Sequence, residues 1–219
     1  AIGLAGSDIA ESSPLGWNCP MGFPYFENMR TDDTIKARLM SARDLDRTLD
    51  RMARQIVELL DPDHHDVGEF ALIGMQTRGV HLAQRLQDKI QDVEGISLPL
   101  GLLDVTMYRD DFRERIDQPR VQVTRIPFDV YGRHLVLVDD VLFTGRTARA
   151  ALDALMDRGR PASVRFLAMV DRGHRELPIC PDIVGREVPT TAGEEVRVRV
   201  QEVDDREGVW LVEPGGAGS

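Results

Sequence analysis

The stretch that decides the fold is Val138-Asp139-Asp140-Val141-Leu142-Phe143-Thr144-Gly145-Arg146-Thr147. It contains the end of an apolar run that begins at His134 and has the composition of a buried strand. A helix is expected from Thr147 to Arg158, because small and apolar side chains recur there at helical spacing. Strand, acidic pair, glycine-containing turn and helix in this order predict an open α/β sheet. Such sheets bind ligands beyond the carboxyl ends of their strands.

The turn and the acidic pair together predict a site for a phosphorylated sugar. Free backbone N–H groups at the start of a helix bind phosphate, and the hydroxyls of Thr144 and Thr147 add donors. Asp139 and Asp140 would repel a phosphate unless a sugar lay between, its hydroxyls donating to the two carboxylates. A lone acidic pair more often only caps the next element, and response-regulator receiver domains also carry acids after a strand. Neither alternative accounts for the Thr-Gly-Arg-Thr turn so late in the chain.

The rest of the chain predicts a mostly parallel sheet flanked by helices. Ser41 and Asp44 have the spacing of a capping box, and a helix with an apolar stripe follows. Within that helix, Asp50 and Arg54 have the spacing of an i,i+4 ion pair. The other expected elements are a strand at Glu69–Gly74, a helix at about Val80–Ile90, an extended stretch at Leu98–Tyr108, a charged exposed loop at Arg109–Asp117, a strand at Ser163–Val170, and β-like segments near residues 182–184, 196–203 and 208–212.

Composition limits the classes of protein to which the chain can belong. At 219 residues, with 42% hydrophobic and 29% charged residues, it has the length and balance of one globular domain. The net charge of −10 argues against a basic coat for nucleic acid, and no run approaches the ~20 apolar residues of a membrane helix. Cys19 and Cys180 give neither metal-ligand spacing nor a disulfide framework, so we expect a reducing, cytoplasmic setting. We expect residues 1–33 to be a disordered extension, 34–213 the folded domain and 214–219 a frayed tail.

Residues Val138–Thr147 are similar to the phosphoribosyl pyrophosphate (PRPP) signature of type I phosphoribosyltransferases. From about Ile35 to Val212, the chain resembles the pyrimidine operon regulatory protein family (PyrR), whose members are also described as uracil phosphoribosyltransferases. The stretches that carry this resemblance are Met75–Gly79, Leu103–Asp111, Ile126–Asp129, Asp171–Pro178 and Val184–Thr190. It implies an α/β type I phosphoribosyltransferase fold with a small C-terminal β-rich hood. It also implies a glycosyltransferase that converts uracil and PRPP to UMP and pyrophosphate.

The resemblance implies roles for individual residues. Arg78 lies where the family binds pyrophosphate, and Arg109 begins a loop that closes over the site; both would act in catalysis with the acidic pair. The residues implied in PRPP or nucleotide binding are Thr77, Arg78, Arg109, Asp139, Asp140, Val141, Leu142, Phe143, Thr144, Gly145, Arg146, Thr147, Arg172 and Val196. Mg²⁺ would arrive with the substrate, bound by pyrophosphate oxygens and few carboxylates, so we expect no preformed metal site in the protein.

Regulatory members of the family bind the pyr leader mRNA when uridine nucleotides are plentiful. Two residues depart from the family pattern: Asp50 stands where a small hydroxyl residue is usual, and Cys180 where arginine is usual. Each makes the surface less positive where RNA phosphate would lie. The candidates for RNA contact are His174, Arg175 and Arg186, which lie in segments resembling the family's basic surface, and Arg51 on the first predicted helix. The arginines of that helix are interleaved with acids, so a salt-bridged, solvated face is the alternative reading there.

Three functions therefore remain open. The first is a bifunctional uracil phosphoribosyltransferase and regulator of pyr transcription, and the second is a PRPP- and UMP-binding enzyme or sensor that has lost RNA binding. A purine phosphoribosyltransferase is the third, although the Asp171–Pro178 stretch speaks against it. The family resemblance implies a homodimer or homotetramer.

Overall fold

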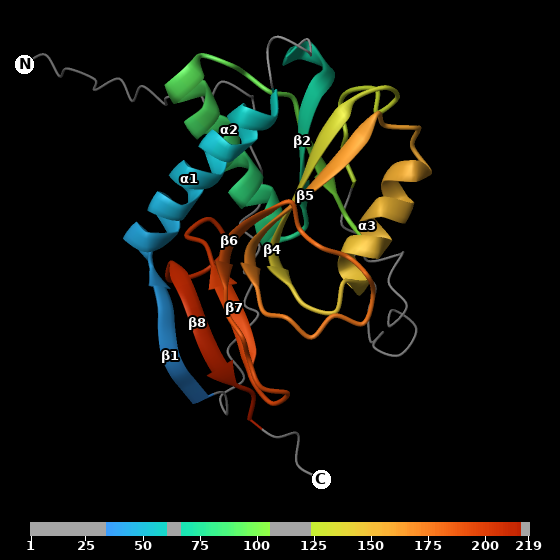
Figure 1. Ribbon diagram of the computed structural model, residues 1–219. Helices are drawn as coiled ribbons and strands as arrows, with labels where there is room; N and C mark the ends of the chain where they lie inside the picture. The colour runs from blue at the N-terminus through green and yellow to red at the C-terminus, as the bar shows by residue number, and fades with distance from the viewer. Residues whose placement is uncertain (1–33, 61–66, 106–123, 216–219) are drawn as a thin grey trace, which may run out of the picture.

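The central feature of the computed structural model is a five-stranded parallel sheet, and the structure describes residues 34–60, 67–105 and 124–215. The strand order is β3-β2-β4-β5-β6. The strands are β2 (Phe70–Met75), β3 (Leu100–Leu103), β4 (His134–Leu142), β5 (Ser163–Asp171) and β6 (Ile183–Glu187). Helices α1 (Ala42–Leu60) and α2 (Arg78–Glu94) cover one face and α3 (Arg146–Met156) covers the other (Figure 1). The predicted α/β architecture is confirmed.

Three further strands form a small antiparallel sheet, which we call the hood. It consists of β1 (Thr34–Ser41), β8 (Gly208–Glu213) and β7 (Glu195–Arg199), in the order β1-β8-β7 (Figure 1). The expected β-rich hood is present with two C-terminal strands, β7 and β8, and β1 from the start of the domain joins them. The extended segment expected at residues 196–203 is also shorter, since β7 ends at Arg199 and turns follow.

The predicted capping box at the start of α1 is confirmed. The Asp44 N–H donates to Ser41 Oγ at 3.2 Å, and the Ser41 N–H donates to Asp44 Oδ2 at 3.0 Å. This exchange satisfies N–H groups that a helix start leaves without intrahelical partners. The helix then buries its predicted apolar stripe against the sheet through Leu45, Leu49, Met52 and Ile56.

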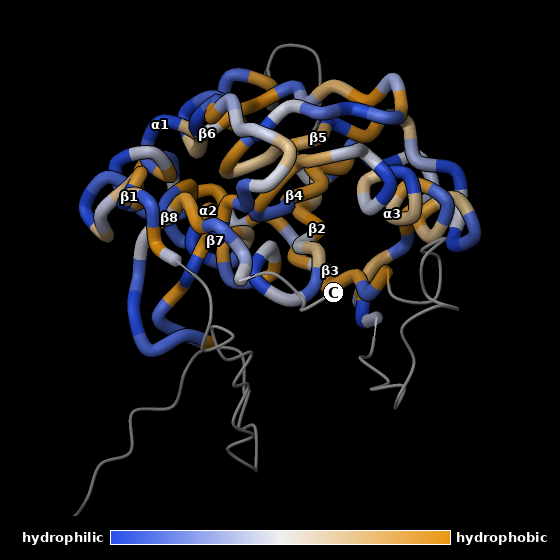
Figure 2. Tube along the Cα trace, turned by 90° about the horizontal axis from the view of Figure 1, so that it is seen from below, coloured by the Kyte–Doolittle hydropathy of each residue, from blue (hydrophilic) through white to orange (hydrophobic). Residues whose placement is uncertain are grey.

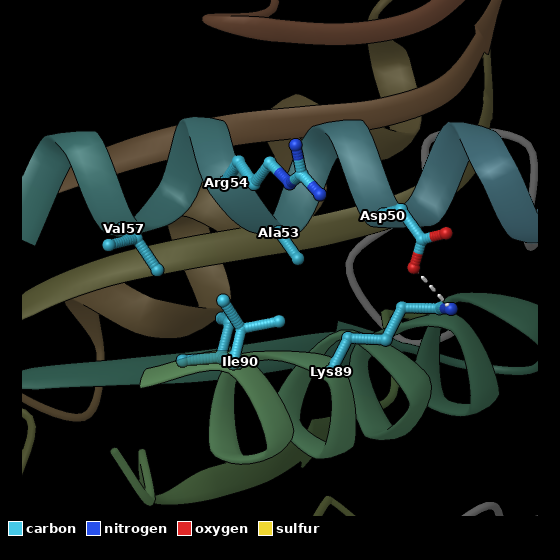
Figure 3. A pocket seen from close by; sticks show the side chains of 7 residues that line it. Asp50, Ala53, Arg54, Val57, Lys89 and Ile90 are labelled. Carbon is cyan, nitrogen blue, oxygen red and sulfur yellow. Dashed lines mark hydrogen bonds and ion pairs between the residues drawn. The ribbon is translucent and has the colours of Figure 1, made fainter. Parts of the chain in front are cut away.

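The predicted ion pair between Asp50 and Arg54 is wrong. Lys89 Nζ of α2 lies 2.6 Å from Asp50 Oδ1 and 2.7 Å from Asp46 Oδ1, so the carboxylates of α1 face the neighbouring helix (Figure 3). Helical spacing shows which residues share a face, but tertiary packing decides which cation reaches the carboxylate. Asp50 and Lys89, together with Ala53, Val57 and other side chains, line a narrow cleft between the helices (Figure 3).

The hydrophobic core lies on both faces of the parallel sheet. Figure 2 shows hydrophobic residues concentrated in the central strands, with hydrophilic residues along the outer elements. On the α3 face the packing side chains are small, and Ala148, Ala151 and Ala154 are buried against the strands. Within the described ranges, no helix is both long and apolar enough to cross a bilayer.

Candidate active site

The acidic pair lies near the carboxyl end of β4, at the edge of the sheet where the loops converge. The strand continues two residues past Asp140, to Leu142, beyond the predicted end. Asp139 is buried, and its Oδ1 accepts the Asp140 N–H at 2.9 Å. Asp140 Oδ1 in turn accepts the Val141 N–H at 3.0 Å. These short backbone contacts fix both carboxylates beside the turn that follows.

The turn after β4, which the sequence predicts to bind phosphate, places a left-handed glycine directly before a helix. Gly145 adopts the left-handed conformation, with φ 90°, and caps a helix that begins at Arg146, one residue earlier than predicted. Thr144 stabilises the turn, because its carbonyl oxygen accepts N–H groups of Glu176 and Leu177 at 3.0 and 3.1 Å. Arg146 points outward, and its Nε lies 2.6 Å from Glu176 Oε2.

Arg78 reaches this edge from the neighbouring strand. The chain leaves β2, passes a cis peptide bond between Gln76 and Thr77, and begins α2 at Arg78. The start of α2 approaches β4 closely, since a Cβ added at Gly79 would lie 2.5 Å from the Val138 carbonyl oxygen. The structure therefore brings the predicted pyrophosphate loop against the predicted ribose-binding carboxylates.

The electrostatics of the acidic pair depend on Arg78. Burial among protein atoms raises the pKa of the Asp140 carboxyl above its ordinary value. The positive charge of Arg78, with hydrogen bonds from Asp139 and the Val141 N–H, opposes this rise without cancelling it. The carboxyl group of Asp140 thus lies within reach of the charge of Arg78, at the edge of the sheet where a polar ligand could hydrogen-bond to it.

Arg172 follows β5 and was expected to reach the phosphates, but the structure turns it toward the hood. Its guanidinium lies 3.9 Å from the centre of the Phe143 ring, and Nε donates to Thr190 Oγ1 at 3.3 Å. Nη2 donates to the carbonyl oxygen of Glu194. Because Arg172 is buried, these acceptors compensate for the water that its charge has lost. A phosphate contact for Arg172 stays a prediction.

Comparison with known proteins identifies the family. Residues 40–202 match the phosphoribosyl transferase domain. The bifunctional protein PyrR of Thermus aquaticus is 52% identical over 183 residues, which are 84% of this chain and 99% of that protein. The bifunctional protein PyrR of Pelotomaculum thermopropionicum is 48% identical, over 81% of this chain and 96% of its own. The chain belongs to the PyrR family.

Among solved structures, a hypoxanthine phosphoribosyltransferase of Trypanosoma cruzi superimposes with a TM-score of 0.65. The superposition covers 82% of this chain and 96% of that one at 16% identity. At this identity the match shows the fold alone. The type I phosphoribosyltransferase fold and the PyrR family, both predicted from the motif Val138–Thr147 and its neighbours, are confirmed.

The arginines proposed to bind RNA donate to acceptors within this PyrR chain. Arg51 donates to the carbonyl oxygens of Val184 and Gly185, at 3.2 and 2.5 Å, and Arg186 donates to the carbonyl oxygen of Leu39. These two arginines line one open groove between α1 and β6. They therefore hold β6 against the start of the domain, whatever else they bind.

The other two RNA candidates lie beside the phosphate turn. Arg175 pairs with Asp171 and donates to the carbonyl oxygens of Phe143 and Ile179 at 2.7 and 3.0 Å. His174 has a positive φ of 59°, and its Nε2 lies 2.6 Å from the carbonyl oxygen of Thr190. The four candidates thus divide into two separate pairs, and RNA contact by any of them stays a prediction.

The remaining predicted residues have mixed outcomes. Val196 is buried in the core, and its backbone pairs with Leu211 of β8, so a base contact there stays a prediction. Arg109 lies outside the described residues. Sequence reasoning missed Asp204, a buried carboxylate in the turn after β7 that pairs with Arg78. Its only sequence signal is an acid after a strand, which is too common to single it out.

Proposed function

We propose that this PyrR-family chain is a uracil phosphoribosyltransferase that converts uracil and PRPP to UMP and pyrophosphate. One observation carries the proposal: two carboxylates and a glycine-containing helix start share one edge of the sheet, with Arg78 opposite. This arrangement supplies acceptors for a ribose, amides for a 5′-phosphate and a cation for a leaving pyrophosphate.

Each group has one task in the proposed reaction. Asp139 and Asp140 accept hydrogen bonds from the ribose hydroxyls, and the turn Thr144–Thr147 binds the 5′-phosphate through N–H groups and hydroxyls. Arg78 balances the charge that develops on pyrophosphate as the bond to C1 breaks. Arg109 would close over the site and exclude water, which competes with uracil for the ribosyl cation.

Mg²⁺ fits this donor set as an ion that arrives on pyrophosphate. The described residues contain no group of three or more His, Cys, Asp or Glu side chains able to hold a metal ion. Mg²⁺ prefers oxygen ligands and commonly binds through substrate phosphates and one or two carboxylates, which the acidic pair offers. When bound, the ion would neutralise charge on the leaving pyrophosphate.

The test is uracil-dependent release of pyrophosphate from PRPP. We expect turnover by the wild type and a loss of about 100-fold or more in Asp140→Asn, because the neutral amide is a weaker acceptor for the ribose hydroxyls. Asp153→Asn removes a carboxylate from the outer surface of α3 and serves as the matched control with unchanged turnover. Absence of uracil-dependent turnover in the wild type, with PRPP binding intact, would leave the sensor as the better account.

We also propose regulation of pyr transcription through the leader mRNA, by a homodimer or homotetramer in the cytoplasm. The open groove lined by Arg47, Arg51 and Arg186 supports this second function. Asp50 is one of the two departures from the family pattern, and it lowers the positive charge of the surface less than expected because Lys89 pairs with it. The other departure, Cys180, is exposed.

The leader RNA should bind with a dissociation constant that falls when UMP is added, at a stated near-physiological salt concentration. Arg47→Gln should weaken binding and reduce its salt dependence, while Arg158→Gln, in the turn that follows α3, should not. Binding that ignores UMP would contradict a nucleotide-dependent regulator. Light scattering would report the oligomeric state.

A further inference from the structure

Asp204 is a buried carboxylate with an unusually complete set of donors. Its side chain is 4% exposed and lies in the turn that follows β7. Arg78 donates to it twice, from Nε at 3.0 Å and from Nη2 at 2.8 Å. Arg199 Nη1 lies at 3.1 Å and the Val200 N–H at 2.9 Å. The last two donors come from the end of β7 and the residue after it, so the segment that carries Asp204 also orients its carboxylate.

The contact with Arg78 is a bidentate one, and this geometry fixes a plane as well as a position. A guanidinium that donates from Nε and one Nη to a single carboxylate has little freedom to rotate, unlike a monodentate or exposed pair. The two residues are 126 positions apart in the sequence, so the hood orients a side chain that begins α2. That side chain stands close enough to Asp140 for its charge to act on the carboxyl.

We propose that Asp204 is a positioning residue that holds the Arg78 guanidinium in the orientation required to bind the pyrophosphate of PRPP. The inference rests on the proposed function only for the identity of the ligand. A free arginine side chain loses rotamer entropy when it is ordered on a ligand. Because Asp204 orders Arg78 in advance, PRPP binding does not bear that cost.

A second ion-pair set joins the same turn to α2 and provides a matched control. Arg85, two turns further along α2, donates to both carboxylate oxygens of Glu202 at 2.8 Å and also pairs with Glu207. This set fastens the turn after β7 to α2 through Arg85, seven residues beyond Arg78. Glu202→Gln therefore weakens the contact between α2 and the turn after β7 without removing either hydrogen bond between Arg78 and Asp204.

The experiment compares PRPP affinity, measured by titration calorimetry, in Asp204→Asn and Glu202→Gln. We expect Asp204→Asn to raise the dissociation constant about 10-fold or more, since the Asn amide has one acceptor oxygen and cannot accept from both Nε and Nη2 of Arg78. The KM for PRPP should rise while the KM for uracil changes less than about twofold. Glu202→Gln should leave PRPP affinity within about twofold of the wild type. Equal losses in both variants would overturn the proposal, because general hood docking would then explain them.

A double-mutant cycle shows whether Asp204 acts through Arg78. In an Arg78→Gln background, Asp204→Asn should cause no further loss of PRPP affinity, because the oriented group is already gone. A full additive loss would overturn the proposal. If Asp204→Asn does not fold, Arg78→Lys keeps the charge but removes the fork, and wild-type PRPP affinity in that variant would also refute it. Affinity needs no turnover, so a failure of uracil transfer in the wild type would reject the proposed function and leave this result readable.

Discussion

Gly79→Ala is the substitution that most directly tests how the two halves of the site are brought together. A Cβ at residue 79 would lie 2.5 Å from the carbonyl oxygen of Val138 and 3.3 Å from the Cα of Asp139. Both are backbone atoms of β4 and have no rotamer through which to move away. Real Cβ contacts are at least 3.0 Å and become ordinary at 3.4 Å, so α2 must move from β4 by 0.5 to 0.9 Å.

This movement has a calculable effect on stability. Overpacking of a tight interface costs about 1–3 kcal/mol, and the better helix propensity of alanine returns about 1 kcal/mol at most. We therefore expect a net loss of about 1 kcal/mol in the free energy of unfolding. For a domain of this length that corresponds to a melting temperature lower by about 3 °C.

Gly79→Ala should lower kcat/KM for PRPP more strongly than it lowers the free energy of unfolding. Arg78 moves with the start of α2 while Asp139 stays in β4, so the two sides of the site separate by most of an ångström. Misplacement of about 1 Å can cost about 100-fold in rate, and we expect kcat/KM for PRPP to fall by 10- to 100-fold. Gly193→Ala is the control, since a Cβ there meets nothing and no positive φ is involved. Full activity and unchanged melting temperature in Gly79→Ala would refute the close approach of α2 to β4.

Three further predictions follow from charges and burial. In metal-free protein, Arg78→Gln should raise the pKa of Asp140 still further, because it removes a cation that lowers it; a fall measured by NMR would contradict this. Lys36→Gln should raise the pKa of Glu194 from about 2 toward its ordinary value. In the wild type this ionised carboxylate stabilises the fold above about pH 4.5, and the stabilisation is lost as the pH falls toward 2; in the variant the stabilisation should be smaller. Leu49→Ala should lower the free energy of unfolding by about 2–5 kcal/mol in urea titrations, because Leu49 is fully buried; a loss below 1 kcal/mol would contradict its place in the core.

The fold could be predicted where burial leaves a pattern in the sequence. Strand β4 is apolar on both faces and carries two acids near its carboxyl end, so its place and its carboxyl edge could be predicted from the residue pattern. Strand β1 was not readable, because its first five residues are exposed and only Met40 is buried. Its strand conformation depends on pairing with β8, which begins 167 positions after β1 ends at Ser41. Such pairing leaves no local signal.

The partners of charged side chains were the part that sequence could not supply. Asp50 was expected to pair with Arg54 one turn away, but Lys89 of the next helix reaches it instead. Arg78 was placed correctly at the edge of the sheet, yet its carboxylate partner, Asp204, lies 126 residues away. Helical spacing ranks only neighbours within an element, whereas ion pairs between elements depend on where the fold brings them.

The stretch Asp171–Pro178 supports the turn after β4 and also contains two of the candidates for RNA contact, so one substitution there could affect both PRPP binding and RNA binding. Its basic residues were predicted to belong to the family's RNA-binding surface, and in the structure the stretch also packs against the turn Thr144–Thr147. Glu176 and Leu177 donate backbone N–H groups to the Thr144 carbonyl oxygen, and Arg175 donates to that of Phe143. A substitution at Arg175 should therefore weaken PRPP binding through the turn, even if the side chain also meets RNA. A loss of RNA binding in such a variant is informative about the RNA surface only when UMP or PRPP affinity is measured in the same protein, because a displaced turn would produce the same loss by removing the nucleotide signal.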